Sequence, residues 1–586
     1  MREHILAFLK KRWPHYAVGI VAIVLSTIMT TSIPKYLGYA IDALQAASPA
    51  VAEAVRCAGV MALLAGVGFL VKLLWRTLII GSGRSVEYYI REQLFLKLQT
   101  LPASFYNENK TGDLISRAIV DIQGLRRLFS MAVANMVDII VSLVISVSFM
   151  IESVNLVTTL VVLAPVPIVV LALFYLRRAL RRRFTRLQEA IAEISDKVQE
   201  NTMGIRIVKG FAQEQSECAE FERLSEAKTR AEMRMGRISS LLGPMTNVAF
   251  GFSYAIFLVL GARMIAEGSL SVGDYVAVNS YITLIINPVS TLSRIMEIWQ
   301  SGMASVHRLN HIFYAKNNVD RTADPAITSV EPTVELRHLT FSYAGGLPPA
   351  LEDVSISLPA GRSLGVMGRT GSGKTTLASV LLKLYPVPDG TVFYGGTDIN
   401  RIPSAVLRPR IAYVPQDNFL FSDTITHNIA FFDPAITPDR AKQAAEAAVI
   451  REEIEQFPDG FDTILGERGV TLSGGQKQRV SIARALVRHA PMVILDDCLS
   501  AVDTNTEAAI LQKMQSELSG TTSVIISHRA SSVEHCDEIV FLENGRILER
   551  GTHAELMARG GRYRALYDEQ NENRPGTAEQ GGEQIG

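Results

Sequence analysis

The chain has 586 residues, more than one hydrophobic core normally holds, so we expect at least two domains. Hydrophobic residues make up 48% of the chain and the mean hydropathy is +0.20, which suits a protein whose first half lies in lipid and whose second half does not. The 58 basic and 58 acidic residues balance, so no overall charge excess indicates a nucleic-acid partner.

The cysteines are too scattered to form a zinc site or a disulfide framework, because no two have CxxC spacing. They are Cys57, Cys218, Cys498 and Cys536. This pattern favours free thiols in a reducing cytoplasm.

The N-terminus is basic and then apolar, as in a signal peptide. Its apolar run is long, however, and lacks a small-x-small cleavage site, so we predict a retained first membrane span. Six nearly uncharged runs follow one another in the first half: Tyr16–Pro34, Cys57–Val71, Met131–Met150, Leu156–Leu176, Ile238–Ala262 and Tyr275–Ser293. Most approach the ~20 residues that cross a bilayer as a helix. The alternative, buried helices of a soluble protein, is disfavoured because soluble helices of such length usually keep a polar face.

Basic residues gather on one side of the predicted spans. They precede span one (Arg2, Lys10, Lys11, Arg12) and follow span four (Arg177, Arg178, Arg181, Arg182, Arg183, Arg186). By the positive-inside bias, both termini and both long connectors are cytoplasmic, in a multi-pass protein of the inner or plasma membrane.

The two long connectors, Gly83–Ser130 and Arg177–Arg237, have helix-like periodicity, so spans two to five should continue as helices into the cytoplasm. Each has one break, at Leu101–Arg117 and Glu200–Glu214, that suits a short crosswise helix on which a soluble domain pushes. Plain turns of helical hairpins are the alternative.

A few polar or helix-bending residues interrupt the spans. Lys72 and Asp138 reach similar depth at about 1.5 Å per residue, so pairing or a wet cavity is expected for them. The alternative, which also covers Arg76, is snorkelling at the inner interface. Prolines that can kink the spans are Pro34, Pro165, Pro167 and Pro288.

After Arg308 the pattern changes to short strands alternating with helices, which is typical of an α/β domain with a mainly parallel sheet. We therefore predict a membrane domain over 1–314, a linker over 315–333, an α/β domain over 334–568 and a disordered tail over 569–586.

The stretch "GRTGSGKTT" follows an apolar strand and opens a helix, as a phosphate-binding loop does. Its glycines and successive N–H groups approach phosphate, Lys374 reaches the β- and γ-phosphates, and Thr375 ligates magnesium. The predicted nucleotide contacts are Gly368, Arg369, Thr370, Gly371, Ser372, Gly373, Lys374, Thr375 and Thr376.

A second strand, "MVILDD", ends in two carboxylates. We expect Asp496 to hold the magnesium shell and Asp497 to lie where a general base meets the attacking water.

These motifs, with Tyr343, "YVPQD", "LSGGQ", "SAVD" and "ISHR" after six spans, resemble half of an ABC exporter over about Lys10–Asp568. The resemblance implies an all-α six-helix transmembrane domain with long cytoplasmic helical extensions, fused to an α/β P-loop ABC nucleotide-binding domain. It also implies ATP and Mg²⁺ as cofactors, with each ATP held between one subunit's phosphate loop and the other's "LSGGQ".

Carried over by position, the resemblance assigns further roles. Tyr343 would stack on adenine, Gln416 would bind the metal and link it to the membrane half, and His528 would grip the γ-phosphate. The signature residues Ser473, Gly474, Gly475 and Gln476 would meet the opposite ATP, Asp503 would cross the dimer seam, and Glu467 would meet the crosswise helices. The alternatives are a core aromatic for Tyr343 and a helix cap for His528.

Asp497 departs from the family pattern, which has glutamate there. Its carboxylate lies roughly 1.5 Å further back, and a displacement of about 1 Å can cost ~100-fold in rate. ATP binding should persist while hydrolysis at this chain's own Walker motifs is slow. The sequence thus resembles the degenerate-site half of heterodimeric bacterial multidrug exporters, with a slow homodimer as the alternative.

We therefore expect one subunit of an ATP-driven exporter of amphipathic drugs or lipid-like molecules. Its partners would be a second exporter half, the lipid bilayer and a hydrophobic or amphipathic cargo, without nucleic acid. The alternatives are a homodimeric lipid or peptide exporter and an ATP-gated channel or regulatory receptor. An importer is disfavoured by the fused ATPase, and no peptidase domain is expected before span one.

Overall fold

The computed structural model describes residues 1–46, 49–343, 348–466, 469, 472–500, 502 and 504–572. They fall into two compact units. One unit comprises Met1–Gln99 and Gly112–Tyr314, and the other comprises Thr100–Thr111 and Ala315–Gly586.

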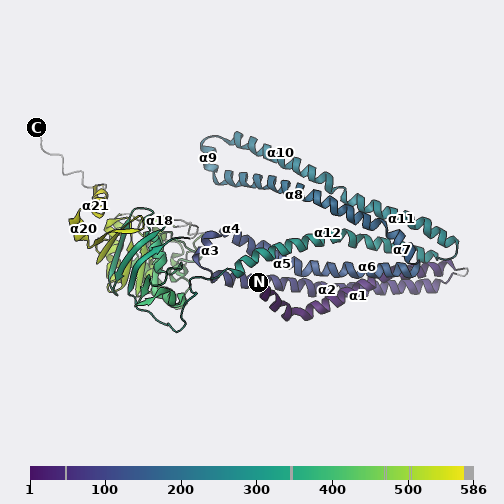
Figure 1. Cartoon of the computed structure of the whole chain (residues 1–586), viewed down its shortest axis with the longest axis horizontal. Helices are drawn as coiled ribbons and strands as arrows, with labels where there is room; N and C mark the ends of the chain where they lie inside the picture. Colours follow the sequence, from purple (N-terminus) through teal and green to yellow (C-terminus); the bar gives the residue numbers. More distant parts are fainter. Residues whose placement is uncertain are drawn as a thin grey trace. The chain divides into compact units, whose positions relative to one another are not determined.

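The first unit is built from helices, as its long apolar and Ala/Leu/Glu/Arg-rich runs predict (Figure 1). In chain order they are α1 (Arg2–Gln45), α2 (Val51–Gln99), α4 (Thr111–Ser116), α5 (Ile122–Arg127), α6 (Val133–Ser153), α7 (Leu156–Leu163), α8 (Pro165–Met203), α9 (Ile205–Gly210), α10 (Glu214–Ser239), α11 (Leu242–Ala266) and α12 (Val272–Tyr314). Two π-helical segments, Arg117–Asp121 and Leu128–Ala132, flank α5.

Among the described residues, four helical stretches are long and apolar enough to cross a membrane: Arg2–Gln45, Val51–Gln99, Thr111–Ser153 and Asn247–Ala266. Two more apolar helices are shorter, Leu156–Ile168 and Val272–Ile286. All six predicted apolar runs therefore contain helix, but the count of six spans and the cytoplasmic extensions remain predictions. The helix continues through Pro34 and Pro288, whereas Pro165 begins α8 just after α7 ends.

Polar contacts hold some of these helices together. Asp121 is 4% exposed and accepts hydrogen bonds from the Ser305 hydroxyl at 2.9 Å and from Arg308 Nε at 2.9 Å, which ties a π-helical segment to α12. Asp138 accepts a hydrogen bond from Thr27 Oγ1 at 2.6 Å. Within the described part of the chain no ion pair joins Asp138 to Lys72, so the hydroxyl of α1 takes the place that the sequence suggested for a lysine.

A short helix lies in each of the two predicted breaks of the long connectors. α9 lies between α8 and α10, which run side by side as an antiparallel pair (Figure 1), so it also forms the turn of a helical hairpin. The other is α3 (Ala103–Glu108), which belongs to the second unit, where Asn107 Nδ2 donates to the Tyr385 hydroxyl at 2.6 Å.

The second unit contains two sheets. The six-stranded sheet has the order β10–β9–β3–β8–β7–β6 and is parallel except at β10, which confirms the predicted mainly parallel α/β domain. Its strands are β3 (Ser363–Gly368), β6 (Ile411–Val414), β7 (Met492–Asp496), β8 (Thr522–Ile526), β9 (Glu538–Glu543) and β10 (Arg546–Gly551). The antiparallel sheet β2–β1–β4–β5 contains β1 (Val334–Phe341), β2 (Leu351–Leu358), β4 (Val392–Tyr394) and β5 (Thr397–Asp398).

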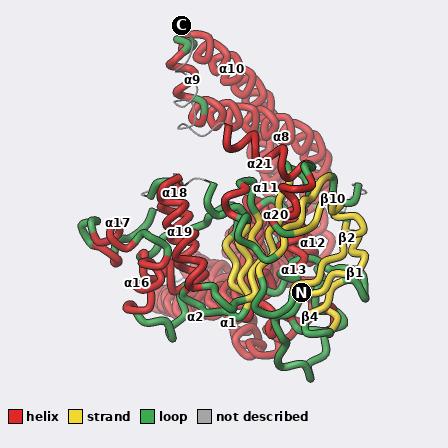
Figure 2. Tube along the Cα trace, turned by 90° about the vertical axis from the view of Figure 1, so that its left-hand side faces the viewer, coloured by secondary structure: helices red, strands yellow, loops and turns green. Residues whose placement is uncertain are grey.

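Most of the longer helices of this unit pack on one of two buried clusters. α13 (Lys374–Leu381) packs against the sheet with the main core, and α16 (Pro438–Ala447), α17 (Arg451–Glu455), α18 (Gly474–Leu486) and α19 (Thr504–Glu517) gather to one side of the strands (Figure 2). The remaining helices are α14 (Ser404–Leu407), α15 (Ile425–Ala430), α20 (His553–Arg559) and α21 (Arg562–Glu572). α21 continues four residues past Asp568, the predicted domain end.

The predicted linker, 315–333, contains no helix or strand and is pinned to the second unit. Asp320 forms an ion pair with the buried Lys383 at 3.0 Å and accepts a hydrogen bond from the Ser404 hydroxyl at 2.7 Å. Burial favours the neutral acid, but the hydrogen bonds from Ser404 and Lys383 lower the pKa of Asp320 below its ordinary value. The linker is therefore held by an ion pair just past the end of α13.

Candidate nucleotide-binding site

The loop between β3 and α13 has the backbone of a phosphate-binding loop. Gly368 and Gly373 have φ values of 153° and 101°. A Cβ atom at Gly368 would lie 2.2 Å from the Leu542 carbonyl oxygen, and one at Gly373 would lie 2.4 Å from that of Ala350. Only glycine fits both places, so these positions would let backbone N–H groups approach an anion bound at the start of α13.

Lys374 is the first residue of α13 and lies buried inside this loop. Its ammonium donates hydrogen bonds to the carbonyl oxygens of Gly368 at 2.8 Å and Arg369 at 2.9 Å. Burial lowers the pKa of Lys374 to about 8, although Asp497 and Asp496 oppose the shift. The lysine is thus a cation held at the place where phosphate charge would arrive.

Thr375 lies in the first turn of α13, next to Asp496, which is the last residue of β7. Thr375 Oγ1 donates to Asp496 Oδ1 at 3.3 Å, while Asp496 Oδ2 is buried without a hydrogen-bond partner among the described residues. Burial raises the pKa of Asp496 above its ordinary value, although the hydrogen bond from Thr375 opposes the shift. A hydroxyl and a carboxylate with a spare oxygen are ligands that suit Mg²⁺, so the residues present fit this ion.

Asp497 has left-handed backbone geometry, with φ of 47°, and its N–H donates to the Ile526 carbonyl oxygen at 2.9 Å. Such geometry in a residue other than glycine is strained and is often found at functional sites. Its carbonyl oxygen accepts a hydrogen bond from the Ser500 hydroxyl at 3.2 Å, and Gln478 of α18 donates to Ser500 at 3.1 Å. The backbone of Asp497 is therefore held at both its N–H and its carbonyl oxygen.

His528 faces the phosphate loop, with Nδ1 at 3.5 Å from Lys374 Nζ. Burial and then the charge of Lys374 lower the pKa of His528, so the neutral imidazole is favoured near pH 7. The structure thus brings Lys374, Thr375, Asp496, Asp497 and His528 together.

Gln570 is a neighbour of His528 that the sequence reasoning missed. Its side-chain amide donates to the His528 carbonyl oxygen at 2.6 Å and accepts from the Ala530 N–H at 2.9 Å. It lies in α21, inside the segment predicted as a tail. Tyr567 lies one turn before Gln570 in α21 and Tyr563 lies two turns before it, and both pack on a buried cluster. Their helical spacing was the signal in the sequence that the helix continues to Gln570.

Tyr343 is half-buried and packs against the main core, which agrees in part with the alternative prediction of a core aromatic residue. Its hydroxyl donates to Thr376 Oγ1 at 3.1 Å, and its ring meets Tyr385 edge to face at 5.2 Å. Gln416 follows β6 and is exposed. Its backbone carbonyl oxygen accepts a hydrogen bond from Asn418 Nδ2 at 3.3 Å. Adenine stacking by Tyr343 and metal binding by Gln416 remain predictions.

The signature residues stand at the N-terminus of α18. Ser473 caps the helix by accepting from the Gln476 N–H at 3.3 Å, and the Gln476 side chain accepts from the Ser473 N–H at 2.9 Å. The Ser473 hydroxyl keeps its own hydrogen to donate, and the N–H groups of Gly474 and Gly475 are among the first of the helix. This end of α18 is a complete anion-binding surface. Asp503 and Glu467 lie outside the described residues.

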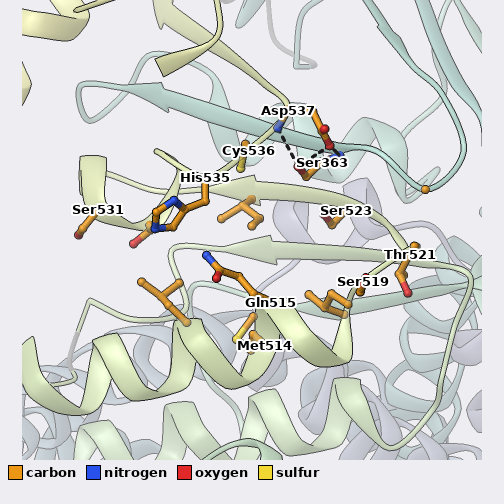
Figure 3. Close-up of a pocket in the computed structure, with 16 residues that line it drawn as sticks. Ser363, Met514, Gln515, Ser519, Thr521, Ser523, Ser531, His535, Cys536 and Asp537 are labelled. Carbon is orange, nitrogen blue, oxygen red and sulfur yellow. Dashed lines mark hydrogen bonds between the residues drawn. The ribbon is translucent and has the colours of Figure 1, made fainter. Parts of the chain in front are cut away.

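A separate cavity of about 210 Å³, shown in Figure 3, lies near the amino ends of β3 and β8. The phosphate loop follows the carboxyl end of β3 instead. Met514 and Gln515 of α19 line one side, and Ser363 and Asp537, joined by hydrogen bonds, line another. The cavity is therefore not part of the nucleotide site.

Comparison with known proteins agrees with this geometry. Residues 16–289 match the family model "ABC transporter transmembrane region", and residues 351–500 match "ABC transporter". The chain is 33% identical over 98% of both chains to the protein described as a probable multidrug resistance ABC transporter ATP-binding/permease protein, YheI, of Bacillus subtilis.

Other relatives agree. The chain is 32% identical to an ATP-dependent lipid A-core flippase of Aromatoleum aromaticum, over 96% of this chain and 95% of the relative. A solved bacterial Atm1-family ABC exporter with ATP bound superposes with a TM-score of 0.82 at 26% identity, covering 95% of this chain and 99% of that one. The chain therefore belongs to the ABC transporters, as a membrane exporter in which one polypeptide carries a helical transmembrane region and an ATP-hydrolysing domain.

Proposed function

We propose that this chain is one half of an ATP-driven exporter that pairs with a different chain, contributing a slow ATP site of its own and an intact signature motif to its partner's site. The observation that carries this proposal is Asp497, a carboxylate one methylene shorter than glutamate beside an otherwise complete set of site residues. The signature motif of the same chain is intact and well capped, which supports its use in the opposite site.

Each residue has a definite task in this proposal. Lys374 and the loop N–H groups bind the β- and γ-phosphates, and Thr375 and Asp496 hold Mg²⁺, which would neutralise phosphate charge when bound. The neutral His528 donates to the γ-phosphate. Asp497 orients the attacking water from too far back, which costs about 100-fold in rate, or about 3 kcal/mol of barrier.

The cargo is an amphipathic or hydrophobic molecule. The names of the relatives, a multidrug resistance transporter and a lipid A-core flippase, support this class because drugs and lipids share an apolar body and a polar end. Two ATPs would close the nucleotide domains and hydrolysis would reopen them, so that the membrane half alternates between inward-open and outward-open states. The short helices α3 and α9 would carry this motion.

The proposal is tested by expressing the chain with the exporter half encoded by a neighbouring reading frame. We expect a stable complex in which that partner has glutamate after its Walker aspartate, and ATP-dependent uptake of amphipathic dyes into inverted vesicles. A chain that purifies and transports only as a homodimer would contradict the heterodimer. Ohmic current in a bilayer without uptake would indicate a channel instead.

A further inference from the structure

A carboxylate from a neighbouring helix holds the signature motif. Glu453 lies in α17 and accepts a hydrogen bond from Gln476 Nε2 at 2.9 Å. It also forms a two-pronged pair with Arg479 of α18, with Nη1 to Oε1 at 2.6 Å and Nη2 to Oε2 at 3.0 Å. Arg479 is 8% exposed, whereas the Glu453 side chain is 39% exposed, so the guanidinium is the buried partner of the pair.

The side chain of Gln476 is held at both ends. Its oxygen accepts from the Ser473 N–H at 2.9 Å, and its nitrogen donates to Glu453. Because the amide group is planar, two fixed ends leave it one orientation. That orientation sets the backbone at Ser473, whose hydroxyl and following N–H groups form the anion-binding end of α18.

Arg479 constrains the next part of the motif. Its Nε points at the Gly475 carbonyl oxygen at 3.4 Å, and its Nη1 also donates to the Val449 carbonyl oxygen at 2.8 Å. The arginine therefore ties Gly475 to the α16–α17 region. Glu453 fixes the guanidinium in turn, since a two-pronged carboxylate pair allows little rotation.

Charge argues for the same role. A lone carboxylate near the N-terminus of α18 would repel the phosphates of ATP, because that helix end binds anions. The guanidinium of Arg479 neutralises Glu453. The carboxylate can thus position the motif without weakening the attraction of the helix end for phosphate.

We infer that Glu453 is a positioning residue for ATP hydrolysis, which holds Gln476 and Arg479 so that Ser473 and Gly475 meet the γ-phosphate bound by the opposite subunit. This inference rests on the proposed function, in which each signature motif completes the other subunit's site. In this inference Glu453 acts through Gln476 and Arg479 and is not a ligand of the nucleotide.

The test is the ATPase activity of the full-length chain assembled with its partner half, in wild type and Glu453→Ala. Since a displacement of about 1 Å costs ~100-fold, we expect kcat to fall by about tenfold to 100-fold. Binding of a fluorescent ATP analogue to this chain's own phosphate loop should be unchanged, and vanadate trapping should be lost in the opposite subunit. A kcat equal to wild type would overturn the inference, as would an equal loss of affinity at the chain's own site.

Two further variants separate positioning from stability. Glu455→Ala removes a carboxylate of the same helix, which pairs with Arg451 at 2.8 Å and is exposed, and should leave kcat unchanged. Gln476→Ala combined with Glu453→Ala should lose less than the sum of the two single losses in free energy, because the two residues share one hydrogen bond. Additive losses would contradict this. Should Glu453→Ala not fold, Glu453→Gln keeps the volume and must still lower kcat several-fold.

Failure of the proposed function would look different. Ser473→Arg blocks the signature surface directly. An ATPase rate equal to wild type in Ser473→Arg would contradict the two-subunit ATP site. A lowered rate in Ser473→Arg together with a wild-type rate in Glu453→Ala would contradict only the role of Glu453.

Discussion

At the scale of residues, the site combines buried charge with one short side chain. Lys374, Asp496 and His528 lie close together, and burial shifts each pKa toward the neutral form. Such pKa shifts are typical of functional sites, including sites that bind a charged ligand. Asp497 differs from a glutamate only in reach, so the proposed defect concerns rate and not binding.

The lowered pKa of Lys374 predicts a pH dependence of ATP binding. In the folded chain the ammonium loses its proton as pH rises through about 8, whereas an ordinary lysine would lose it near pH 10.4. ATP binds the protonated form, so affinity should be constant below this pH and should fall above it, about tenfold per pH unit. Titration with a fluorescent ATP analogue from pH 6.5 to 9.5 checks this. Lys374→Arg should bind weakly at every pH but without the fall, and a fall that persists in this variant would contradict the assignment.

Asp138 gives a prediction about cargo. Its carboxylate accepts from Thr27 and the residue is exposed in the helical unit, so it can meet a cationic cargo. Losing one such contact, worth about 1.4 kcal/mol, weakens binding about tenfold. Asp138→Asn should therefore reduce uptake of a cationic dye into inverted vesicles about tenfold more than uptake of a neutral dye. Glu152→Gln, which removes a carboxylate paired with Lys35 at 2.9 Å, is the control. Equal losses for both dyes would remove Asp138 from the cargo path.

At the scale of elements, apolar periodicity and loop chemistry predicted a good deal. The parallel sheet and the phosphate loop before α13 follow from local patterns, because glycine and apolar runs act over a few residues. The contacts of Gln570 and Glu453 were not predictable in this way. Each pairs with residues 23 to 42 positions away, and only the folded chain brings them together.

The C-terminal helix α21 should hold the His528 loop through Gln570. Gln570→Ala removes two hydrogen bonds, each worth about 1 kcal/mol net, and should loosen the loop. We expect faster amide hydrogen exchange at Ala530 and an ATP affinity lowered several-fold, with ADP affinity unchanged because ADP lacks the γ-phosphate. Asp568→Ala, which removes an exposed pair with Arg564, is the control. Unchanged exchange at Ala530 would show that Gln570 does not hold the loop.

At the scale of the whole molecule, the chain joins a helical membrane region to an ATP-hydrolysing domain, and its comparisons agree with this over nearly its full length. The identity of the partner half is the feature least accessible from one sequence. In the proposed pairing it would depend on surfaces completed by another polypeptide, and Asp503, the residue expected at the dimer seam, lies outside the described structure.

The turnover of ATP by the purified chain alone tests the central claim most directly, since it isolates the site that Asp497 serves. The account predicts fewer than about 0.1 turnovers per second, against the roughly 1 to 1,000 per second typical of enzymes, with ATP still bound tightly. A turnover within the typical range would contradict the account, whether or not Asp497→Ala then abolished it.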